Sequence, residues 1–489
     1  MRRNLGQSIR HGLAWSLAGT IIVRLGGLVV GIVLARLLTP EQFGVYAVAL
    51  TVTTILITLA DLGLGAVLLR ADDPERLAPT VATLGLLAGT LLAGGMALSS
   101  GIVAAAFGIP DAAPVIAVLS LSLLLGGIAV VPYSLLLRNF EQNKLFATSV
   151  VEFAVGTVVS IGLVLLGLGP MALALARIAA QCTSTAMQFV LARWRPRVGF
   201  DRAVAGPALR FGLQASSAAV LSVVLMNIDN MVIARIAGDV SLGFYALAFN
   251  IASWPMTAIG QAVRSVSIQA FAESERQRVV RGNAGRDPSL AVGTTFAWAA
   301  AVPVGTLLAV LSVPLIGVLY GGRWIPASAA LAALGAFGAL RVLLTVIDYY
   351  LLARGAAGTV AWIQVLWIVA LTPAMVAGTY LFGITGGGWS HMIIGVCVML
   401  PVYLVAAQRA GADVSAVVRG LIPPVLAAVP CWYAARWVAS SFETPLLGLT
   451  CGGITGVVVY LGLIHRWIMR VWQSIHRPSA AALSTRGKR

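Results

Sequence analysis

The chain has 489 residues, of which 59% are hydrophobic and only 10% charged, and its mean hydropathy is +0.94. A soluble domain carries about 25% charged residues, so this composition excludes a soluble enzyme and indicates a polytopic membrane protein. The net charge of +16 lies mostly in short loops between apolar stretches, so we expect anionic membrane lipids, and no nucleic acid, as its electrostatic partners.

Fourteen apolar stretches recur along the chain, and each is long enough to cross a hydrocarbon core of about 30 Å as a helix. The loops between them are short and leave no room for a soluble domain. We therefore predict an all-α polytopic membrane protein with about 14 transmembrane helices. The expected spans are residues 13–34, 43–69, 81–106, 113–137, 145–168, 170–191, 211–235, 242–268, 290–318, 328–352, 360–382, 388–407, 421–440 and 446–465.

The Lys and Arg residues are distributed unevenly between the loops. With the N-terminus placed inside, the cytoplasmic segments hold 25 of the 33 basic residues, and the external loops hold only 4. Such an excess is typical of the cytoplasmic loops of membrane proteins. The pattern predicts a multi-pass protein with both termini in the cytoplasm.

An internal repeat predicts how the spans are arranged. Val33–Leu37 and Gly44–Ala49 recur 199 residues later as Val232–Ile236 and Gly243–Ala248. The repeat aligns spans one and two with spans seven and eight, so the two halves hold six spans each in the same orientation. The predicted domains are a six-helix bundle over residues 1–202, a second over 203–407, two additional helices over 408–465, and a basic amphipathic cytoplasmic tail over 466–489.

Motifs for catalysis and metal binding are absent from the sequence. Neither Lys144 nor Lys488 stands in the Gly-Lys-Ser/Thr context of a phosphate-binding loop, which excludes an ATPase of that type. The four histidines lack metal-ligand spacing, and no Gly-x-Ser-x-Gly motif occurs. We therefore expect neither an enzyme nor a bound cofactor or metal.

Eight charged residues lie inside the predicted spans, where each costs roughly 2.5–3.5 kcal/mol at a helix centre unless it pairs or meets water. Both halves contribute to this set, which suggests a water-filled central cavity between the two repeats. The residues are Arg24, Arg177, Arg264, Arg341, Asp61, Glu152, Asp229 and Asp348.

Arg24 and Arg341 lie near the middle of spans one and ten and are the strongest candidates for substrate binding. A guanidinium group at that depth suits a phosphate or carboxylate, which it can bind with two parallel hydrogen bonds. Tyr349 and Tyr350 could contact a sugar or head group beside it, or belong to the interfacial aromatic belt. In the competing interpretation, each arginine pairs with a nearby acid such as Asp61 or Asp348.

A second set of residues is assigned to coupling or gating. Arg264 and Glu152 lie near the cytoplasmic ends of their spans, where long side chains also reach water at little cost. Asn227 and Asp229, in the outer half of span seven, either bind a proton or sodium ion or cap a helix break. The whole set is Asp61, Glu152, Asn227, Asp229, Arg264 and Asp348.

Several blocks of sequence resemble one family of transporters. The run Leu34–Ala47 and its continuation Ala60–Leu64 resemble the signature region of the bacterial oligosaccharide and polysaccharide flippases (Wzx-like) of the multidrug/oligosaccharidyl-lipid/polysaccharide (MOP) exporter superfamily. Further blocks agree at Arg193–Arg197, from Asn227–Asp229 through Gly243–Ala246, and at Tyr320–Ala327.

The resemblance implies a fold of two six-helix bundles that form a V around a cationic cavity, with two extra helices, in the bacterial inner membrane. It also implies alternating access that moves a polyprenyl-diphosphate-linked oligosaccharide from the inner to the outer leaflet for surface polysaccharide biosynthesis. By position, Arg24, Arg177 and Arg341 would meet the diphosphate and sugars. A polysaccharide polymerase is a candidate partner, and a proton or sodium gradient is a candidate source of energy.

Two other functions compete with this interpretation. A cation-coupled multidrug exporter of the same fold would favour acids and aromatic side chains in its cavity, whereas this chain has four arginines inside its spans. A membrane-bound glycan polymerase or glycosyltransferase would normally carry a sizeable external loop with acids, His or Arg, and no such loop is expected here.

Overall fold

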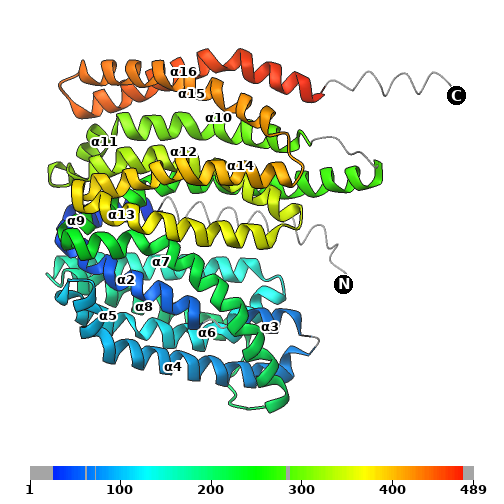
Figure 1. Ribbon diagram of the computed structural model, residues 1–489. Helices are drawn as coiled ribbons and strands as arrows, with labels where there is room; N and C mark the ends of the chain where they lie inside the picture. The colour runs from blue at the N-terminus through cyan, green and yellow to red at the C-terminus, as the bar shows by residue number, and fades with distance from the viewer. Residues whose placement is uncertain (1–25, 61–62, 72, 282–286, 477–489) are drawn as a thin grey trace. The chain divides into compact units, whose positions relative to one another are not determined.

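The computed structural model describes residues 26–60, 63–71, 73–281 and 287–476, with the backbone alone for stretches that include 207–222 and 262–270. These residues are almost entirely helical, and the only β-pairing among them is an isolated bridge between Asp287 and Ala412. The predicted all-α fold is confirmed (Figure 1). The chain divides into two compact units, Met1–Ala246 and Leu247–Arg489.

The first unit begins with the helix Gly26–Leu37. It continues with α2 (Pro40–Ala60), α3 (Leu64–Arg70), α4 (Pro74–Ala106), α5 (Ala113–Leu119), α6 (Leu121–Arg138), α7 (Gln142–Leu165), α8 (Pro170–Ala192) and the first half of α9 (Arg202–Arg281). The start of α4 is set by its local sequence. Pro74 occupies the first turn, and the Asp73 side chain caps the helix by accepting a hydrogen bond from the Arg76 backbone amide at 3.2 Å.

The interior of the first unit is held together by close helix contacts. Helix α7 packs along α8, and α4 packs along α6. The α4–α6 contact requires glycine, because a Cβ atom on Gly127 would lie only 2.1 Å from the carbonyl oxygen of Gly85. In α2, the hydroxyls of Thr53 and Thr54 donate to the carbonyls four residues earlier, both at 2.7 Å, so these polar groups are satisfied within the helix itself.

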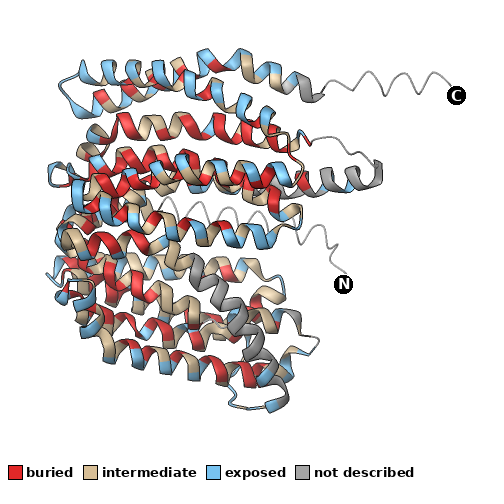
Figure 2. Cartoon of the chain, in the orientation of Figure 1, coloured by how far each residue is buried: buried red, intermediate tan, exposed pale blue. Residues whose placement is uncertain are grey.

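The second unit is also helical. It holds the end of α9, α10 (Ser289–Val310), α11 (Ser312–Leu319), α12 (Ala327–Ala353), α13 (Ala357–Ile394), α14 (Leu400–Arg409), α15 (Val414–Ser440) and α16 (Pro445–His476). Helix α12 is the most buried of the long helices in this unit: 78% of its most apolar part is buried, against 22% for α15 and 28% for α16. Figure 2 shows the same contrast in its colours. Leu331, Leu343 and Ile347 of α12 are fully buried, so this helix forms the core of the unit.

Two long helices contain breaks where the chain turns back. In α13, Phe382 and Gly383 leave helical geometry, and Gly383 has a φ of 57°. The segments on either side then pack together, since the Ser390 hydroxyl donates to the carbonyl of Ala374 at 2.8 Å. These segments correspond to predicted spans eleven and twelve. In α9, Gly238, with a φ of 81°, separates predicted spans seven and eight.

Ten helical stretches among the described residues are long and apolar enough to cross a membrane, and two of them, Val223–Gln261 and Ala357–Arg409, contain these breaks. Helix α8 is absent from the ten because it carries Arg177, Gln181 and Gln188 among its apolar residues. The number of fourteen spans stays a prediction.

At the C-terminus, α16 runs unbroken to His476. The first residues of the predicted amphipathic tail, from residue 466, therefore continue the helix of the last span.

Candidate functional site

The two copies of the sequence repeat contact each other directly in the first unit. A Cβ atom on Gly44 would lie 1.9 Å from the carbonyl oxygen of Asp239, and a Cβ atom on Gly243 would lie 1.8 Å from that of Pro40. Pro40 and Gly44 occupy the repeat positions of Asp239 and Gly243, each 199 residues earlier. The contact is therefore reciprocal, as in an interface around a two-fold axis, and both helix starts can touch because neither carries a side chain there.

A buried polar network lies beside this reciprocal contact. The Tyr245 hydroxyl donates to Asp229 Oδ2 at 3.0 Å, across the break at Gly238, and Asp229 is only 2% exposed. The side-chain amide of neighbouring Asn230 donates to the Thr51 hydroxyl of α2 at 3.1 Å. Asp229 therefore ties the two segments of α9 together in this structure. Asn227 instead donates to the Val223 carbonyl of its own helix at 2.8 Å.

Removal of the Tyr245 hydroxyl should destabilise this network. In Tyr245→Phe, the buried Asp229 carboxylate loses one of its donors, which we expect to cost about 1–3 kcal/mol of stability. Thermal unfolding of the purified protein in detergent tests this. Tyr433→Phe is the matched control because Tyr433 is 69% exposed, and equal unfolding temperatures for the two variants would contradict a structural role for the hydrogen bond.

Arg177 and Glu152 are exposed although both lie well inside their helices, so Glu152 is farther from a helix end than the sequence predicted. At 1.5 Å per residue, Glu152 is about 15 Å into α7 and Arg177 about 10 Å into α8. Arg177 also lies within electrostatic range of the Tyr46 hydroxyl of α2. Charged side chains at that depth are stable only beside water or a partner, which makes this surface of the first unit a candidate wall of an aqueous pathway.

Helix α8 contributes a polar side chain, Gln188, that was not among the residues predicted from the sequence. Buried Gln188 Oε1 has no hydrogen-bond partner among the described residues. Gln188 lines a cavity of about 330 Å³ together with Tyr133 and Ser134 of α6. An unsatisfied buried polar atom beside a cavity indicates a place for water or a polar ligand. The signal in the sequence is the low hydropathy of α8, which indicates that this helix carries polar side chains.

In the second unit, Arg341 lies in a polar cluster inside the helix bundle. It is partly exposed and within electrostatic range of His391, which is buried on the returning segment of α13. The His391 ring packs on Phe337, with ring centroids 4.9 Å apart. The sequence showed His391 only as a histidine without metal spacing, since nothing in a single sequence indicates which helix it would face.

Asp348 lies on the same face of α12 as Arg341, as the seven-residue spacing predicts, but no ion pair joins the two among the described residues. The Tyr403 hydroxyl of α14 lies within electrostatic range of the Asp348 carboxyl. Buried Asp348 Oδ1 and Tyr403 Oη nevertheless lack a hydrogen bond of normal geometry. Trp367 of α13 contacts the rings of Phe337 and Tyr403 edge-on, at 6.3 and 6.5 Å.

A π-helical turn allows His391 and Tyr403 to face the same interior. Gly395–Met399 forms a π-helix between them. At about 100° per residue, twelve residues of regular α-helix would place the two side chains about 120° apart, and a one-residue π insertion reduces this to about 20°. Four aromatic side chains therefore lie near Arg341 and Asp348 of α12. They are Phe337 of α12, Trp367 and His391 of α13, and Tyr403 of α14.

The remaining predicted residues fall into two groups. Buried Tyr350 points its ring to Phe271 at 5.4 Å and lies 5.0 Å under the Arg354 guanidinium, while Tyr349 is half-buried. Tyr350 thus has a packing role in this structure. Arg24, Asp61 and the side chain of Arg264 lie outside the described residues.

An ion pair just after α12 connects it to the segment before α10. Buried Arg354 pairs with Asp287, whose backbone binds the turn after α14: the Asp287 amide donates to the Gly411 carbonyl at 2.9 Å, and the Asp413 amide donates to the Asp287 carbonyl at 3.1 Å. Burial lowers the pKa of Arg354 from its ordinary value, although an arginine stays protonated. No group of three or more potential metal ligands occurs in the described part of the chain.

Comparison with known proteins identifies the family. Residues 33–329 match the family described as polysaccharide biosynthesis protein, and this match covers more than half of the chain. The chain belongs to this family. The predicted family resemblance is therefore confirmed, and the matched segment contains the repeat, the reciprocal glycine contact and the start of α12.

Three named proteins are similar to this chain over most of its length. The succinoglycan biosynthesis transport protein ExoT of Rhizobium meliloti is 27% identical over 88% of this chain and 87% of its own length. The lipopolysaccharide biosynthesis protein WzxC of Escherichia coli is 25% identical over 80% of both chains. The teichuronic acid biosynthesis protein TuaB of Bacillus subtilis is 24% identical over 90% of this chain and 91% of its own.

Solved structures with the same fold are membrane transporters. The lipid II flippase MurJ in an inward closed conformation has a TM-score of 0.76 at 14% identity and covers 94% of this chain and 99% of its own. An inward-facing multidrug resistance MATE family transporter of the MOP superfamily has a TM-score of 0.66 at 17% identity and covers 83% and 99%. At these identities, the similarity establishes the fold.

Proposed function

We propose that this protein is a flippase that moves a polyprenyl-diphosphate-linked oligosaccharide from the inner to the outer leaflet of the bacterial inner membrane by alternating access. The observation that carries the proposal is the family match, with relatives that include a succinoglycan transport protein over 88% of the chain. The oligosaccharide is destined for a surface polysaccharide. The protein acts as a transporter and not as an enzyme.

The charged residues support a negatively charged, polar substrate. Arg341 is partly exposed and Arg177 is exposed, and both lie inside helices of an apolar protein. A guanidinium group at such a position can bind a diphosphate with parallel hydrogen bonds. Arg24 has the same role by its place in the sequence. Gln188, Tyr133 and Ser134 would offer hydrogen bonds to the sugars.

Reciprocal contact between the repeats supports alternating access. A transporter of this type must alternately close its two sides, and a closure between equivalent helix starts needs small residues that let backbones touch. Gly44 and Gly243 meet that requirement. With the N-terminus in the cytoplasm, both glycines lie at the outer ends of their spans, so their contact closes the outer side.

Asp348 is the best placed of the predicted coupling residues. Its carboxyl is inside the second unit, has Tyr403 beside it, and lies on the face of α12 that carries Arg341. An acid with a buried oxygen that lacks a hydrogen bond can exchange a proton as its surroundings change. We assign it proton coupling, while Asp229 keeps the structural role and Glu152 a place in the aqueous pathway.

Asp348→Asn should separate coupling from translocation. The amide keeps the shape of the side chain but cannot release a proton, so we expect a pH gradient to lose its stimulation of transport while exchange without a gradient continues. Transport in vesicles with and without the gradient measures this. Asp111→Asn, at an exposed position outside the helices named above, is the control, and gradient stimulation of the Asp348 variant equal to that of the control would exclude Asp348 as the coupling group.

The function itself is testable with purified protein in vesicles. The substrate is the polyprenyl-diphosphate-linked oligosaccharide extracted from cells depleted of this protein, and its accessibility to external periodate is followed with time. Faster oxidation of the inner-leaflet pool in vesicles with protein supports the flippase. Equal oxidation in empty vesicles, together with uptake of a cationic drug, would instead support a multidrug exporter of the same fold.

A further inference from the structure

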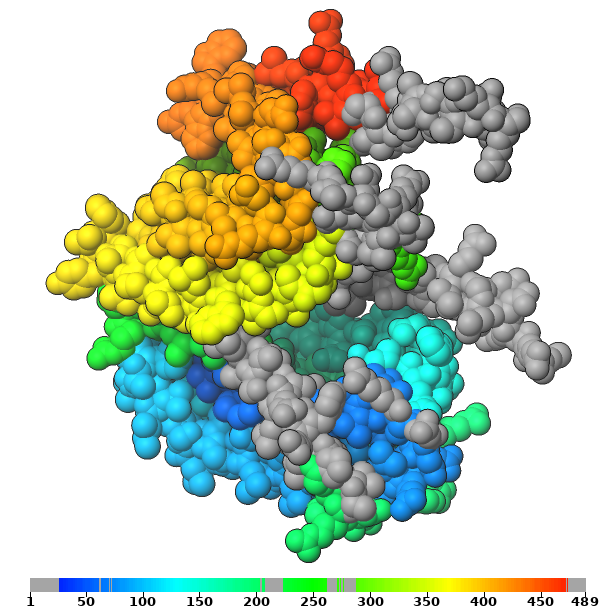
Figure 3. Space-filling model, turned by 45° about the vertical axis from the view of Figure 1, so that its right-hand side comes forward, coloured from blue at the N-terminus to red at the C-terminus, as the bar shows by residue number. Residues whose placement is uncertain are grey.

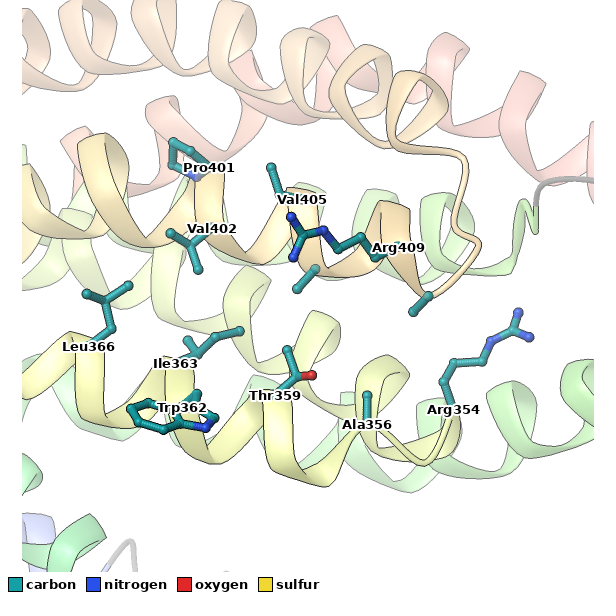
Figure 4. A pocket seen from close by; sticks show the side chains of 12 residues that line it. Arg354, Ala356, Thr359, Trp362, Ile363, Leu366, Pro401, Val402, Val405 and Arg409 are labelled. Atoms are coloured by element: carbon teal, nitrogen blue, oxygen red, sulfur yellow. The ribbon is translucent and has the colours of Figure 1, made fainter.

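The second unit contains a long groove between α14 and the first half of α13. Its volume is about 840 Å³, which is in the range of sites for small ligands. Figure 4 shows the lining side chains on the two facing helices. The lining residues are Arg354, Ala356, Thr359, Trp362, Ile363, Leu366, Pro401, Val402, Val405, Ala406, Arg409 and Ala410.

The groove has an apolar floor and apolar, accessible walls. Ile363 and Ala406 form the floor and are 3% and 9% exposed, while Trp362 and Val405 on the walls are 75% and 47% exposed. Both helices belong to a stretch long and apolar enough to span the membrane. Figure 3 shows α13 and α14, in yellow and orange, side by side on the protein surface. A groove of this kind in a transmembrane segment is open to lipid chains.

Positive charge is confined to one end of the groove. Arg354 follows the last residue of α12, Arg409 is the last residue of α14, and Figure 4 shows both at the same end, away from Leu366 and Pro401. Asp287 fixes the position of Arg354 through the ion pair and its backbone bonds to the turn after α14. Asp287 also offsets the charge of Arg354, so exposed Arg409 supplies the net charge of this end.

The charge pattern excludes the chain's own termini as the occupant. Residues 1–25 and 477–489 contain basic residues and no Asp or Glu, so both would be repelled by the arginine end. An occupant that complements the groove needs an anionic head and an apolar chain. The distribution of Lys and Arg assigns this end to the cytoplasmic side, where membrane lipids with anionic head groups attract basic residues.

We propose that this groove binds one anionic phospholipid of the cytoplasmic leaflet, with its phosphate on Arg409 beside Arg354 and an acyl chain along Ile363 and Ala406. A guanidinium group binds phosphate through parallel hydrogen bonds, and the apolar floor replaces the lipid neighbours of the chain. The lining contains none of the residues assigned to the transported substrate. The inference therefore stands independently of the proposed transport function.

Native mass spectrometry of the full-length protein in detergent tests the site. The protein is titrated with phosphatidylglycerol and with phosphatidylcholine of the same acyl chains. We expect tighter binding of phosphatidylglycerol, by about fivefold, because Arg409 supplies one net positive charge at this end of the groove. Arg409→Glu should abolish this preference. Arg419→Glu should keep it, because Arg419 is exposed on the next helix but does not line the groove.

A second pair of variants tests the apolar part of the groove without disturbing the core. Val405→Trp fills the groove from an accessible wall and should weaken phosphatidylglycerol binding about tenfold or more. Val418→Trp, at a position that is 41% exposed on α15, should have no effect. Equal lipid binding by both members of either pair would overturn the proposal. So would displacement of the bound phospholipid by polyprenyl diphosphate, since the groove would then belong to the transported substrate.

Discussion

Arg341→Ala should reduce export of the surface polysaccharide by about 10- to 100-fold, because a hydrogen bond to a charged group contributes about 1.5–3 kcal/mol. Arg341 is partly exposed in the middle of the most buried helix of its unit. Its loss leaves the substrate phosphate without this partner. Complementation of a strain that lacks the chromosomal copy measures the effect, with membrane abundance of each variant determined on blots.

The charge and the shape of Arg341 are separable. Arg341→Lys keeps the charge but not the planar pair of donors, so we expect partial export. Arg36→Ala and Arg235→Ala serve as controls, since these exposed arginines occupy equivalent positions of the repeat in predicted external loops. Arg24→Ala should behave like Arg341→Ala. If the loop variants proved more harmful than Arg341→Ala at equal abundance, Arg341 would not be a substrate contact.

Gly44→Ala and Gly243→Ala should each lower export by more than about tenfold, and by similar factors. A Cβ atom at either position would lie less than 2 Å from a backbone oxygen of the opposite repeat, and backbone cannot move aside as a flexible side chain does. The helix starts must then separate, so the outer side no longer closes. Because the contact is reciprocal, neither copy can compensate for the other.

Gly95→Ala provides the matched control for these two variants. Gly95 lies in α4 and is exposed, and a Cβ atom there would have no other atom within 4 Å, so an added methyl group meets open space. In a helix interior, alanine is favoured over glycine by about 1 kcal/mol, so this variant should be as stable as the parent. Export by Gly44→Ala or Gly243→Ala at the level of Gly95→Ala would show that the reciprocal contact is dispensable.

The sequence predicted the helices well because hydropathy reports directly on burial in lipid. Predicted span 328–352 corresponds to α12 (Ala327–Ala353), and the break predicted between 382 and 388 is found at Phe382 and Gly383. Helix α8 shows the limit of hydropathy as a guide. It carries polar side chains, so it is less apolar than most of the other long helices.

Partners across helices were harder to predict than faces of one helix. The seven-residue spacing placed Arg341 and Asp348 on one face, but nothing in the sequence indicated His391 or Tyr403 opposite them. Their alignment depends on the π-helix at Gly395–Met399, which shifts the helical phase by one residue and has no clear sequence signal. Likewise, the repeat identified Gly44 and Gly243 as equivalent but not as contacting residues.

The flippase function is tested most directly by following lipid-linked sugars in cells depleted of this protein. Radiolabelled precursors are assayed in spheroplasts for their accessibility to an external glycosidase or to periodate. A flippase predicts that labelled polyprenyl-diphosphate-linked oligosaccharide accumulates in a form that these reagents do not reach, and that renewed expression makes it accessible. Unchanged lipid-linked pools and normal surface polysaccharide, together with new sensitivity to cationic drugs, would contradict the account.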